Sequence, residues 1–483
     1  MKVEKIIDGI KVKKCVNFDE KTLKIDIKTL CDNTKNKKIA NSLFVCIEGF
    51  NFDSHNLASK FETLAVKFVV CEKEIDTNLP YIIVESTRSA LSKLCDNFYN
   101  HPTKSFKLIG VIGTNGKTST TYFIKQFIEK NNKKCSVIGT SGVYINNKKL
   151  KETLTTPDPL VLYKLFDKAK KAKSDVVVME ISAHAISLKK VENLKCDIVC
   201  FTNFSQDHLD FFKTMENYKQ TKFSFFNAFN TKKAIINIDC IVGEEIYSII
   251  YGKIDAKTFS LQKKADFCAK NVKTTLQKSV FELVIDGLCK KVEVFVPCLF
   301  NVYNILCAIS VCKELGFVVN QKMLSSIKPV KGRFDVFCLK DNKYIIIDYA
   351  HTPESLKTVF LSIKSLGDNR IIALFGCPGN RDETKREIMG KIAYDFCEKV
   401  IITSDNPKFE NPLIICEEIL WGAKEKGIII EDREKAIDFA IKNLKPNEVL
   451  CIIGKGTEEY QDINNKKIKY SDYFVVSKRI KNL

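Results

Sequence analysis

The sequence predicts an α/β fold built on parallel β-sheets, and two patterns lead to this prediction. The first is that short apolar runs alternate with helical patterns through the middle and last parts of the chain, as in sheets covered by helices. The runs with the character of buried strands are 108–112, 175–180, 344–347, 371–375, 400–402 and 449–453. The second is helical spacing after Lys117, where one face consists of Phe123, Ile124, Phe127 and Ile128.

Length indicates several domains, because 483 residues exceed what one hydrophobic core supports. A typical size of roughly 150 residues per domain predicts about three. A polar stretch at 99–105 precedes one expected strand, and a second boundary falls near 327–330. The expected domains are therefore 1–104, 105–329 and 330–483.

Composition argues against several classes of protein. The net charge of +19 comes from lysines spread over the whole chain, without a basic arm, so no nucleic-acid partner is expected. The 19 cysteines are scattered and form no C-x-x-C pair, which indicates buried, reduced thiols and no zinc site. No apolar run reaches about 20 residues, and the N-terminus has no signal-peptide core. We expect a cytoplasmic chain with no membrane span.

Polar residues stand where several expected strands end. Glu180, Asp348, Asp405 and Gly454 each follow or close such a run. Ligands of open parallel sheets bind outside the carboxyl ends of the strands, so the functional residues should gather on one rim of each domain.

A glycine-rich turn joins the expected strand 108–112 to the helix after Lys117. Such turns direct backbone N–H groups at phosphates, and the helix N-terminus favours an anion. Val111 replaces the first glycine of the common phosphate-loop spacing, which leaves open a glycine turn with an incidental lysine. The residues predicted to bind ATP here are Gly113, Thr114, Asn115, Gly116, Lys117, Thr118 and Ser119.

The order of motifs resembles the Mur ligase family, and within it the MurE type, from about residue 30 to the end. The similar segments are G-T-N-G-K-T-S at 113–119, T-N-x-x-x-D-H-L-D at 202–210, Y-x-x-x-K at 218–222, D-Y-A-H-T-P at 348–353, T-S-D-N-P-K at 403–408 and G-K-G-T-E at 454–458. Taken alone, residues such as Asp207 and His208 would more often be caps or surface loops.

This resemblance implies an ATP-dependent amide ligase that adds the third residue to UDP-MurNAc-L-Ala-D-Glu through an acyl phosphate, in cell-wall peptidoglycan synthesis. It implies an N-terminal UDP-MurNAc-binding domain, a central P-loop ATPase-type parallel sheet and a C-terminal Rossmann-like domain. The catalytic residues would be Lys117, Glu180, His208 and Lys222, and the Mg²⁺ ligands Thr118, Glu180, His208 and Lys222, with Lys222 carbamylated. Further ATP contacts would come from Asn304, Arg333 and Asp348.

Two substrate sites follow from the same resemblance. The UDP-sugar set is Asn33, Ser42, His55, Thr155, Thr156, Ser182 and Lys190. The amino-acid set is Arg386, Asp405, Asn406, Lys408, Gly454 and Glu458. The chain departs from the family at several of these motifs, having Asn33, Ala183, Lys190, Pro378, Asn380, Lys408 and Thr457 where the family has other residues.

The amino acid favoured by these motifs is meso-diaminopimelate, because two cations, Arg386 and Lys408, would repel the cationic tail of L-lysine. The partners expected are the UDP-MurNAc-dipeptide and a diamino acid, with the protein a monomer. L-lysine remains open as the added residue. A folylpolyglutamate synthetase on the same scaffold also remains open, as does a non-catalytic ATP-dependent binding protein with salt-sensitive DNA binding.

Overall fold

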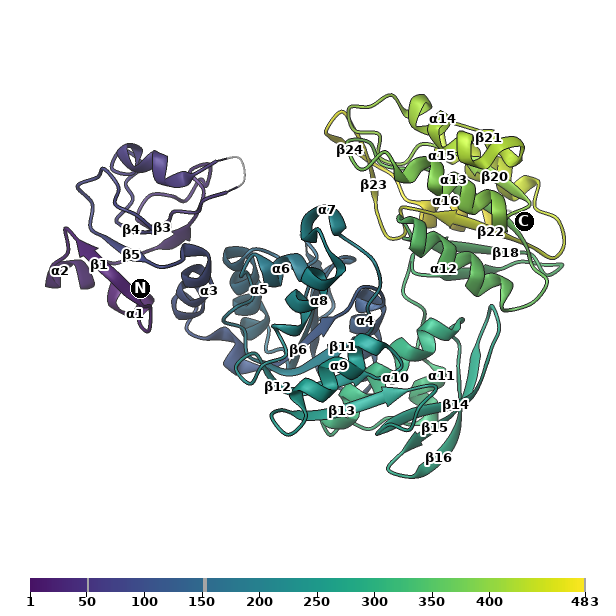
Figure 1. The fold of residues 1–483 in the computed structure, drawn as a ribbon, viewed down its shortest axis with the longest axis horizontal. Helices are drawn as coiled ribbons and strands as arrows, with labels where there is room; N and C mark the ends of the chain where they lie inside the picture. The colour runs from purple at the N-terminus through teal and green to yellow at the C-terminus, as the bar shows by residue number, and fades with distance from the viewer. Residues whose placement is uncertain (50–51, 151–153, 482–483) are drawn as a thin grey trace. The chain divides into compact units, whose positions relative to one another are not determined.

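A computed structural model describes residues 1–49, 52–150 and 154–481, so Phe50 and Asn51 of the segment that resembles the UDP-sugar loop lie outside the described residues. The chain divides into two compact units. One contains Met1–Phe259 with Ser310–Phe317, and the other contains Ser260–Ile309 with Val318–Leu483. Both alternate helices with strands (Figure 1), which confirms the predicted α/β class.

The first unit begins with a five-stranded sheet in the order β1-β5-β4-β3-β2. Its strands are β1 (Val12–Val16), β2 (Thr29–Cys31), β3 (Ser42–Val45), β4 (Phe68–Cys71) and β5 (Tyr81–Val84). All neighbours are parallel except β1, which runs antiparallel to β5. The helices of this part are α1 (Val3–Ile6), α2 (Glu20–Leu23), η1 (Ser54–Lys60), α3 (Thr87–Phe98) and η2 (Pro102–Ser105).

A larger sheet of the same unit carries the phosphate loop, with strand order β13-β12-β11-β6-β10-β7-β8-β9. Its strands are β6 (Lys107–Ile112), β7 (Cys135–Gly139), β8 (Gly142–Ile145), β9 (Lys148–Leu150), β10 (Val176–Glu180), β11 (Cys196–Phe201), β12 (Thr231–Asn237) and β13 (Asp255–Ser260). The pairs between β13 and β7 are parallel, and β8 and β9 add antiparallel strands at one edge.

Helices complete the first unit: α4 (Lys117–Lys130), α5 (Pro159–Lys171), α6 (Ala183–Ser187), α7 (Leu209–Phe212), α8 (Met215–Phe223) and α9 (Ile241–Ile250). The predicted apolar face of α4 is confirmed, since Phe123, Ile124, Phe127 and Ile128 are all buried. This burial fixes the start of α4 against the end of β6, which is where the phosphate loop lies.

The second unit holds an antiparallel set of β14 (Phe267–Thr274), β15 (Ser279–Ile285) and β16 (Leu288–Val294). It also holds a sheet in the order β17-β18-β22-β19-β20-β21, parallel except for β17. These strands, with the hairpin β23–β24, are β17 (Asp335–Cys338), β18 (Tyr344–Asp348), β19 (Arg370–Phe375), β20 (Lys399–Ile402), β21 (Gly427–Ile429), β22 (Glu448–Ile453), β23 (Tyr460–Ile463) and β24 (Lys466–Lys469).

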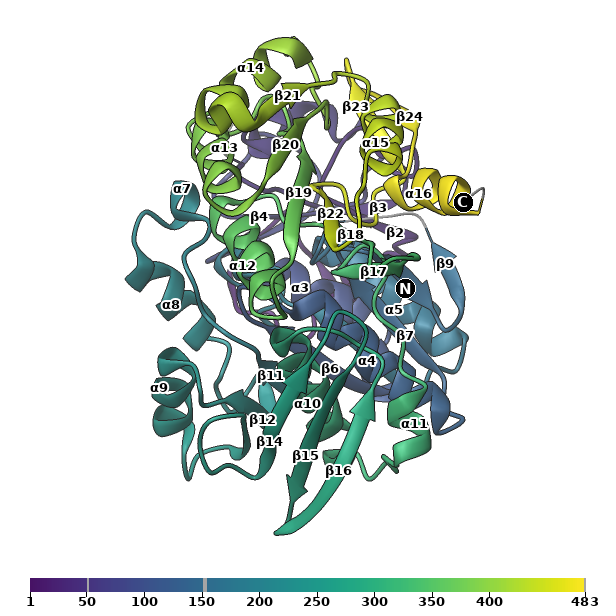
Figure 2. The same ribbon diagram turned by 90° about the vertical axis from the view of Figure 1, so that its right-hand side faces the viewer.

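Helices cover both faces of the six-stranded sheet, as Figure 2 shows. They are α12 (Pro353–Lys364), α13 (Lys385–Phe396) and α14 (Pro412–Ala423) on one face, and α15 (Arg433–Lys442) and α16 (Asp472–Ile480) on the other. Alternation along β18 explains the two layers, because Ile346 packs in one core while Ile345 and Ile347 pack in the other. The remaining elements are α10 (Leu299–Glu314), which has residues in both units, α11 (Gln321–Ser325) and η3 (Lys424–Lys426).

The predicted character of the cysteines is largely confirmed. All 19 are free thiols, and only Cys15, Cys289 and Cys338 are exposed, with Cys240 half-buried. Among the described residues, no helix is long and apolar enough to span a bilayer.

Candidate functional site

The phosphate loop lies between β6 and α4, as predicted. Gly116 caps α4 with a φ of +80°, a conformation that L side chains rarely adopt. A Cβ on Gly113 would lie 1.9 Å from Thr202 Oγ1 and 3.2 Å from the Asn203 backbone. Glycine is therefore required at both positions, one for its backbone angle and one for the close approach of the segment that follows β11.

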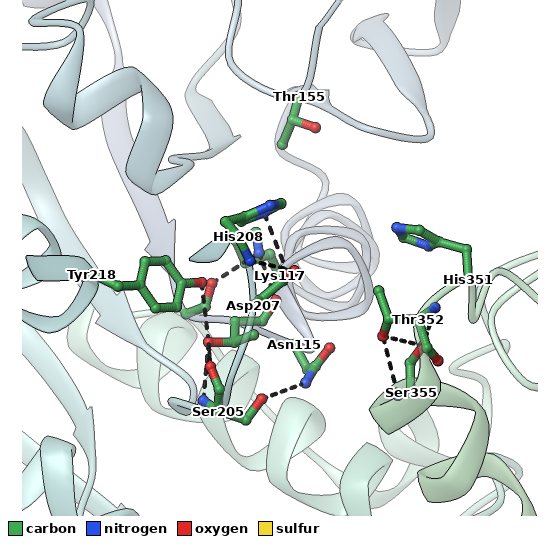
Figure 3. A network of polar contacts seen from close by, with 12 residues as sticks. Asn115, Lys117, Thr155, Ser205, Asp207, His208, Tyr218, His351, Thr352 and Ser355 are labelled. Atoms are coloured by element: carbon green, nitrogen blue, oxygen red, sulfur yellow. Dashed lines mark hydrogen bonds and ion pairs between the residues drawn. The ribbon is translucent and has the colours of Figure 1, made fainter. Parts of the chain in front are cut away.

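The segment after β11 supports this loop through hydrogen bonds. Thr202 Oγ1 donates to Asn115 O at 2.6 Å, and Asn115 N donates to Asn203 Oδ1 at 2.8 Å. Figure 3 shows the Asn115 side chain directed at Ser205, where Nδ2 donates to Oγ at 3.2 Å. The motif at 202–210 thus fixes the loop itself, a role that its residue types alone did not indicate.

Lys117 and Thr118 open helix α4 with their side chains engaged in the loop and with β10. Lys117 Nζ donates to the carbonyls of Gly113 and Thr114, each at 2.8 Å. Thr118 Oγ1 contacts both oxygens of Glu180, at 3.0 and 3.1 Å. Glu180 is the last residue of β10 and only 1% exposed.

Thr140 completes the environment of the Glu180 carboxylate. Its backbone N donates to Oε1 at 2.8 Å and its hydroxyl contacts Oε2 at 3.1 Å. The same hydroxyl lies 3.0 Å from Thr155 Oγ1, while Thr156 Oγ1 donates to Glu180 O at 2.9 Å and accepts from Ser182 N at 2.9 Å. Two of the predicted metal residues, Thr118 and Glu180, therefore meet the predicted T-T-P substrate segment at Glu180.

Lys222, on α8, is 1% exposed, and its amine contacts a hydroxyl and two aromatic rings. Its Nζ donates to Thr114 Oγ1 at 2.9 Å and lies 4.1 Å from the Tyr218 ring centroid and 5.2 Å from that of Phe204. Burial, reinforced by the positive charge of Lys117, holds the pKa of the Lys222 amine well below its usual range. Both effects favour the neutral form of the amine, against the opposing charge of Asp207.

His208 stands at the start of α7, with its ring 4.6 Å from that of His184. Its Nε2 lies 3.4 Å from Asp207 Oδ2, a contact at the centre of Figure 3. Burial lowers the pKa of His208, against the opposing effect of Asp207. A neutral imidazole is the form that can bind a metal ion.

The residues predicted to bind Mg²⁺ near the loop are of several chemical types. Among the residues that the structure describes, no group of three or more His, Cys, Asp and Glu side chains could hold a metal ion. The predicted ligands contain two such residues, Glu180 and His208, and depend for the rest on the Thr118 hydroxyl and on modification of Lys222. Thr118 and Glu180 do place oxygen atoms side by side, which suits Mg²⁺.

A cavity of about 600 Å³ lies in the first unit, beside the five-stranded sheet. Two predicted UDP-sugar residues, Asn33 and Lys190, line it. Lys190 pairs with Asp158 at 2.7 Å, whereas Arg88, which is outside the predicted set, donates to Glu48 O at 2.8 Å. Arg88 gives no motif signal, and only its place in the first turn of α3 brings it to the cavity.

Ser42 and His55 do not line this cavity. Ser42 is fully buried in β3, and His55 is 4% exposed. The His55 ring is held between Asp53, with Nδ1 at 2.5 Å from Oδ1, and Glu72 N, which donates to Nε2 at 3.1 Å. Both side chains shape the fold around the cavity rather than face it.

In the second unit, Asp348 ends β18 and holds the turn from 333 to 335. Its Oδ2 accepts from Phe334 N at 2.6 Å and its Oδ1 from Ala350 N at 2.7 Å. Burial raises the pKa of Asp348, while Arg333 opposes that shift. The Arg333 guanidinium stacks 4.3 Å from the Tyr349 ring. Asn304 lies on α10, where its Nδ2 donates to Asn301 Oδ1 at 3.3 Å.

Four of the predicted amino-acid residues, Asp405, Asn406, Gly454 and Glu458, lie just after the ends of β20 and β22. Asn406 Nδ2 donates to Glu458 Oε2 at 2.9 Å. Gly454 has a φ of +113°, and a Cβ there would meet Asp405 Oδ2 at 2.7 Å. Lys455, absent from the predicted set, is completely buried and joins Asn406 to Glu458. Burial raises the pKa of Asp405, against the opposing charge of Lys455.

Arg386 is 1% exposed on α13 and already paired with two carboxylates. Its guanidinium contacts Glu418 at 2.6 Å and Glu410 at 2.7 Å. Lys408 lies on the adjacent loop in a left-handed conformation, with φ of +52°. Its backbone pairs with the hairpin, since Lys408 N donates to Asp462 O at 2.9 Å.

These features define a multidomain α/β enzyme with a glycine-rich loop of phosphate-binding type on one parallel sheet and a second, Rossmann-like sheet whose strand ends carry charged groups. Residues 111–312 match the model of the Mur ligase middle domain, and residues 332–456 match that of the Mur ligase glutamate ligase domain.

Known proteins and solved structures are also similar to this chain. The chain is 37% identical over 492 residues to UDP-N-acetylmuramoyl-L-alanyl-D-glutamate--2,6-diaminopimelate ligase 1 of Clostridium acetobutylicum, covering 100% of both. A solved UDP-N-acetylmuramoyl-L-alanyl-D-glutamate--2,6-diaminopimelate ligase is 25% identical, with a TM-score of 0.70 over 100% of this chain and 99% of that one. Mycobacterium tuberculosis folylpolyglutamate synthase, solved with ADP and AMPPCP, shares the fold at 14% identity and a TM-score of 0.61, covering 76% of this chain and 92% of that one. The chain belongs to the Mur ligase family and is an ATP-dependent ligase.

Proposed function

We propose that this chain joins meso-2,6-diaminopimelate to UDP-N-acetylmuramoyl-L-alanyl-D-glutamate at the expense of ATP. The observation that carries the proposal is the position of Glu180, which links Thr118 of the phosphate loop to Thr140 and the T-T-P segment within one unit. A carboxylate that contacts both the nucleotide loop and a substrate segment marks the place where ATP and the second substrate would meet for phosphoryl transfer. The names of the relatives supply the substrate class.

The reaction has two steps. An oxygen of the D-glutamate carboxylate attacks the γ-phosphorus of ATP, and the bond to the β,γ-bridging oxygen breaks, which gives an acyl phosphate and ADP. The amine of diaminopimelate then attacks the acyl carbon, the carbon–oxygen bond to phosphate breaks, and the amine loses a proton. Lys117 and the N–H groups of the loop 113–116 would stabilise the phosphoryl charge.

Thr118, Glu180 and His208 would hold Mg²⁺, which supplies positive charge against the phosphates when bound. The fit rests on the paired oxygens of Thr118 and Glu180, 3.0 Å apart, and on the imidazole of His208, whose pKa burial lowers, an effect that favours its neutral form. Loss of turnover after removal of Mg²⁺ by a chelator, restored by added Mg²⁺, is the expected result.

We propose that Lys222 carries a carbamate. Its neutral amine nitrogen would attack the carbon of CO₂, forming an N–C bond while one C=O π bond breaks onto oxygen, and the nitrogen would then lose one proton, which converts a neutral amine into an anionic carbamate. Support comes from its burial, its lowered pKa and its hydrogen bond, because its Nζ donates to the Thr114 hydroxyl rather than to a carboxylate. Labelling with ¹³CO₂ should give a carbamate signal by NMR that Lys222→Arg abolishes. A signal that persists in the variant would refute the assignment.

Asn33, Thr155, Thr156, Ser182 and Lys190 would bind the UDP-sugar, with Arg88 added from the structure. Cations at the cavity suit a diphosphate. Ser42 and His55 would instead support the strands around it, because both are buried. In the second unit, Arg333, Asp348 and Asn304 would contact ATP.

The amino-acid site would use Arg386, Asp405, Asn406, Lys408, Gly454 and Glu458. One observation favours L-lysine as the second candidate: Glu410 and Glu418 offset the charge of Arg386, which weakens its repulsion of a lysine tail. The positive charge of Lys408 acts in the other direction, since it favours a ligand with a second carboxylate.

The test is phosphate release with ATP, Mg²⁺ and UDP-MurNAc-L-Ala-D-Glu, comparing diaminopimelate with L-lysine. Phosphate release that requires diaminopimelate supports the proposal, and release with L-lysine alone would show that L-lysine is the amino acid added. Lys117→Ala should abolish turnover, and undiminished turnover would sink the mechanism. ATP binding without phosphate release with either amino acid would favour a non-catalytic binding protein. Domain boundaries at 104 and 329, a monomeric state and a cytoplasmic location stay predictions.

A further inference from the structure

Lys455 is a fully buried lysine in the turn after β22, with its charge enclosed by the amino-acid site. Its Nζ donates to Asn406 Oδ1 at 2.9 Å and to Glu458 Oε2 at 3.0 Å. Burying an ammonium is costly unless it is paired and hydrogen-bonded. Such a group is retained where its contacts matter to its neighbours, and both of these partners belong to the predicted amino-acid site.

The contacts of Asn406 fix which end of its carboxamide faces which partner. The backbone N of Asp462 donates to Oδ1 at 2.9 Å, and a backbone N–H can only donate, so this atom is the oxygen. Lys455 takes the second acceptor position of the same oxygen. Nδ2 donates one hydrogen to Glu458 Oε2. Of the four hydrogen bonds that Asn406 can make, the one left over is an N–H donor.

We propose that Lys455 is a positioning residue that sets amino-acid specificity through Asn406. The Asp462 N–H takes one acceptor position of the carboxamide oxygen and Lys455 takes the other, so that only an N–H donor of Asn406 is left for the ligand. A donor recognises the far carboxylate of diaminopimelate, a group that L-lysine lacks. This inference rests on the proposed function, because it takes Asn406 as a contact of the incoming amino acid.

Lys455→Met tests the proposal, since methionine keeps an unbranched apolar chain and removes the ammonium. The KM for diaminopimelate should rise about tenfold or more, as expected when a buried hydrogen-bonding group loses its partner. The KM values for ATP and for the UDP-dipeptide should not change, and the ratio of kcat/KM for diaminopimelate over L-lysine should fall. The matched control is Lys467→Met, an exposed lysine whose Nζ lies 3.7 Å from the Tyr460 ring centroid. It should leave all these values unchanged.

Two further variants keep the test decisive. Lys455→Arg retains the charge and should keep more of the preference for diaminopimelate than Lys455→Met. Asn406→Asp replaces the donor by an acceptor of the same shape and should remove that preference; it decides the matter if circular dichroism shows Lys455→Met to be unfolded. A folded Lys455→Met with the wild-type ratio, or one that loses kcat uniformly for both amino acids, would overturn the inference. Failure of the proposed function looks different, because the unaltered protein would then release no phosphate with either amino acid.

Discussion

Gly139 offers the sharpest test of the site around Glu180. It is the last residue of β7, and a Cβ built there would lie 2.2 Å from Glu180 Oε1, 2.8 Å from Cδ and 2.9 Å from Cγ. Its φ lies outside the left-handed region, so the backbone accepts alanine and the cost is steric. Because non-bonded atoms settle near about 3.5 Å, Gly139→Ala must displace the carboxylate by roughly 1 Å.

The displacement would weaken the hydrogen bonds to Glu180 Oε1, the oxygen nearest to the added methyl group. Oε1 accepts from Thr140 N at 2.8 Å and from Thr118 Oγ1 at 3.0 Å. A hydrogen bond to a charged group contributes about 1.5–3 kcal/mol, and a catalytic group misplaced by about 1 Å can lose roughly 100-fold in rate. We therefore expect kcat of Gly139→Ala to fall about 100-fold, with the KM for the amino acid unchanged, since that site lies on other strands.

Phosphate release measures the effect, and thermal unfolding separates it from a loss of stability. Ser136→Ala, in the same strand, is the control: it removes a contact to Ser174 Oγ at 2.8 Å and a bond from Asn146 N at 2.9 Å. This variant should lose about 1 kcal/mol of stability and keep its turnover. Turnover of Gly139→Ala within threefold of the unaltered protein would refute the view that Glu180 must stay in place.

Three other substitutions have definite expected outcomes. Lys222→Met should flatten the pH dependence of stability in CO₂-free buffer. Between the lowered pKa and the ordinary value of 10.5, the unfolded state of the unaltered chain binds more protons than the folded state, so its free energy of unfolding rises with pH. Equal slopes of that free energy against pH for the two proteins, measured by urea titration, would count against this. Arg433→Met should cost about 3–5 kcal/mol in denaturant unfolding, because it leaves Asp472, paired with it at 2.8 Å and fully buried, without its cation; a loss below about 1 kcal/mol would show the pair to be dispensable. Arg88→Met should raise the KM for the UDP-dipeptide about tenfold in steady-state assays and leave that for ATP alone, whereas no change would remove Arg88 from the substrate site.

The sheets and the rims of the site could be predicted because strand burial and strand ends leave direct traces in the sequence. Buried parallel strands appear as apolar runs, and β10 and β18 end at Glu180 and Asp348, where the runs end. The phosphate loop was equally accessible, since its glycines serve needs that no other residue meets.

Other parts of the site depend on contacts that a pattern does not contain. Ser42 belongs to a motif, yet all four residues of β3 are buried, so alternation could not tell which face it takes. Thr140 and Arg88 have ordinary neighbours in sequence, and only folding brings one to Glu180 and the other to the cavity. Residue type predicts what chemistry is possible, while burial and partners decide which of it is used.

Two buried lysines, Lys222 and Lys455, show how the partners of a side chain affect the chemistry open to it. Lys222 is 1% exposed and Lys455 is not exposed at all, so burial alone would treat them alike. Lys222 contacts a hydroxyl and aromatic rings beside another cation, and its pKa is lowered, whereas Lys455 forms an ion pair with Glu458 at 3.0 Å. A neutral amine can react with CO₂ and become an anion; a paired ammonium can only hold its neighbours in place. Under the two proposals, lysines at the same depth would serve reaction chemistry in one unit and recognition in the other, and the charge of the neighbouring groups would determine which.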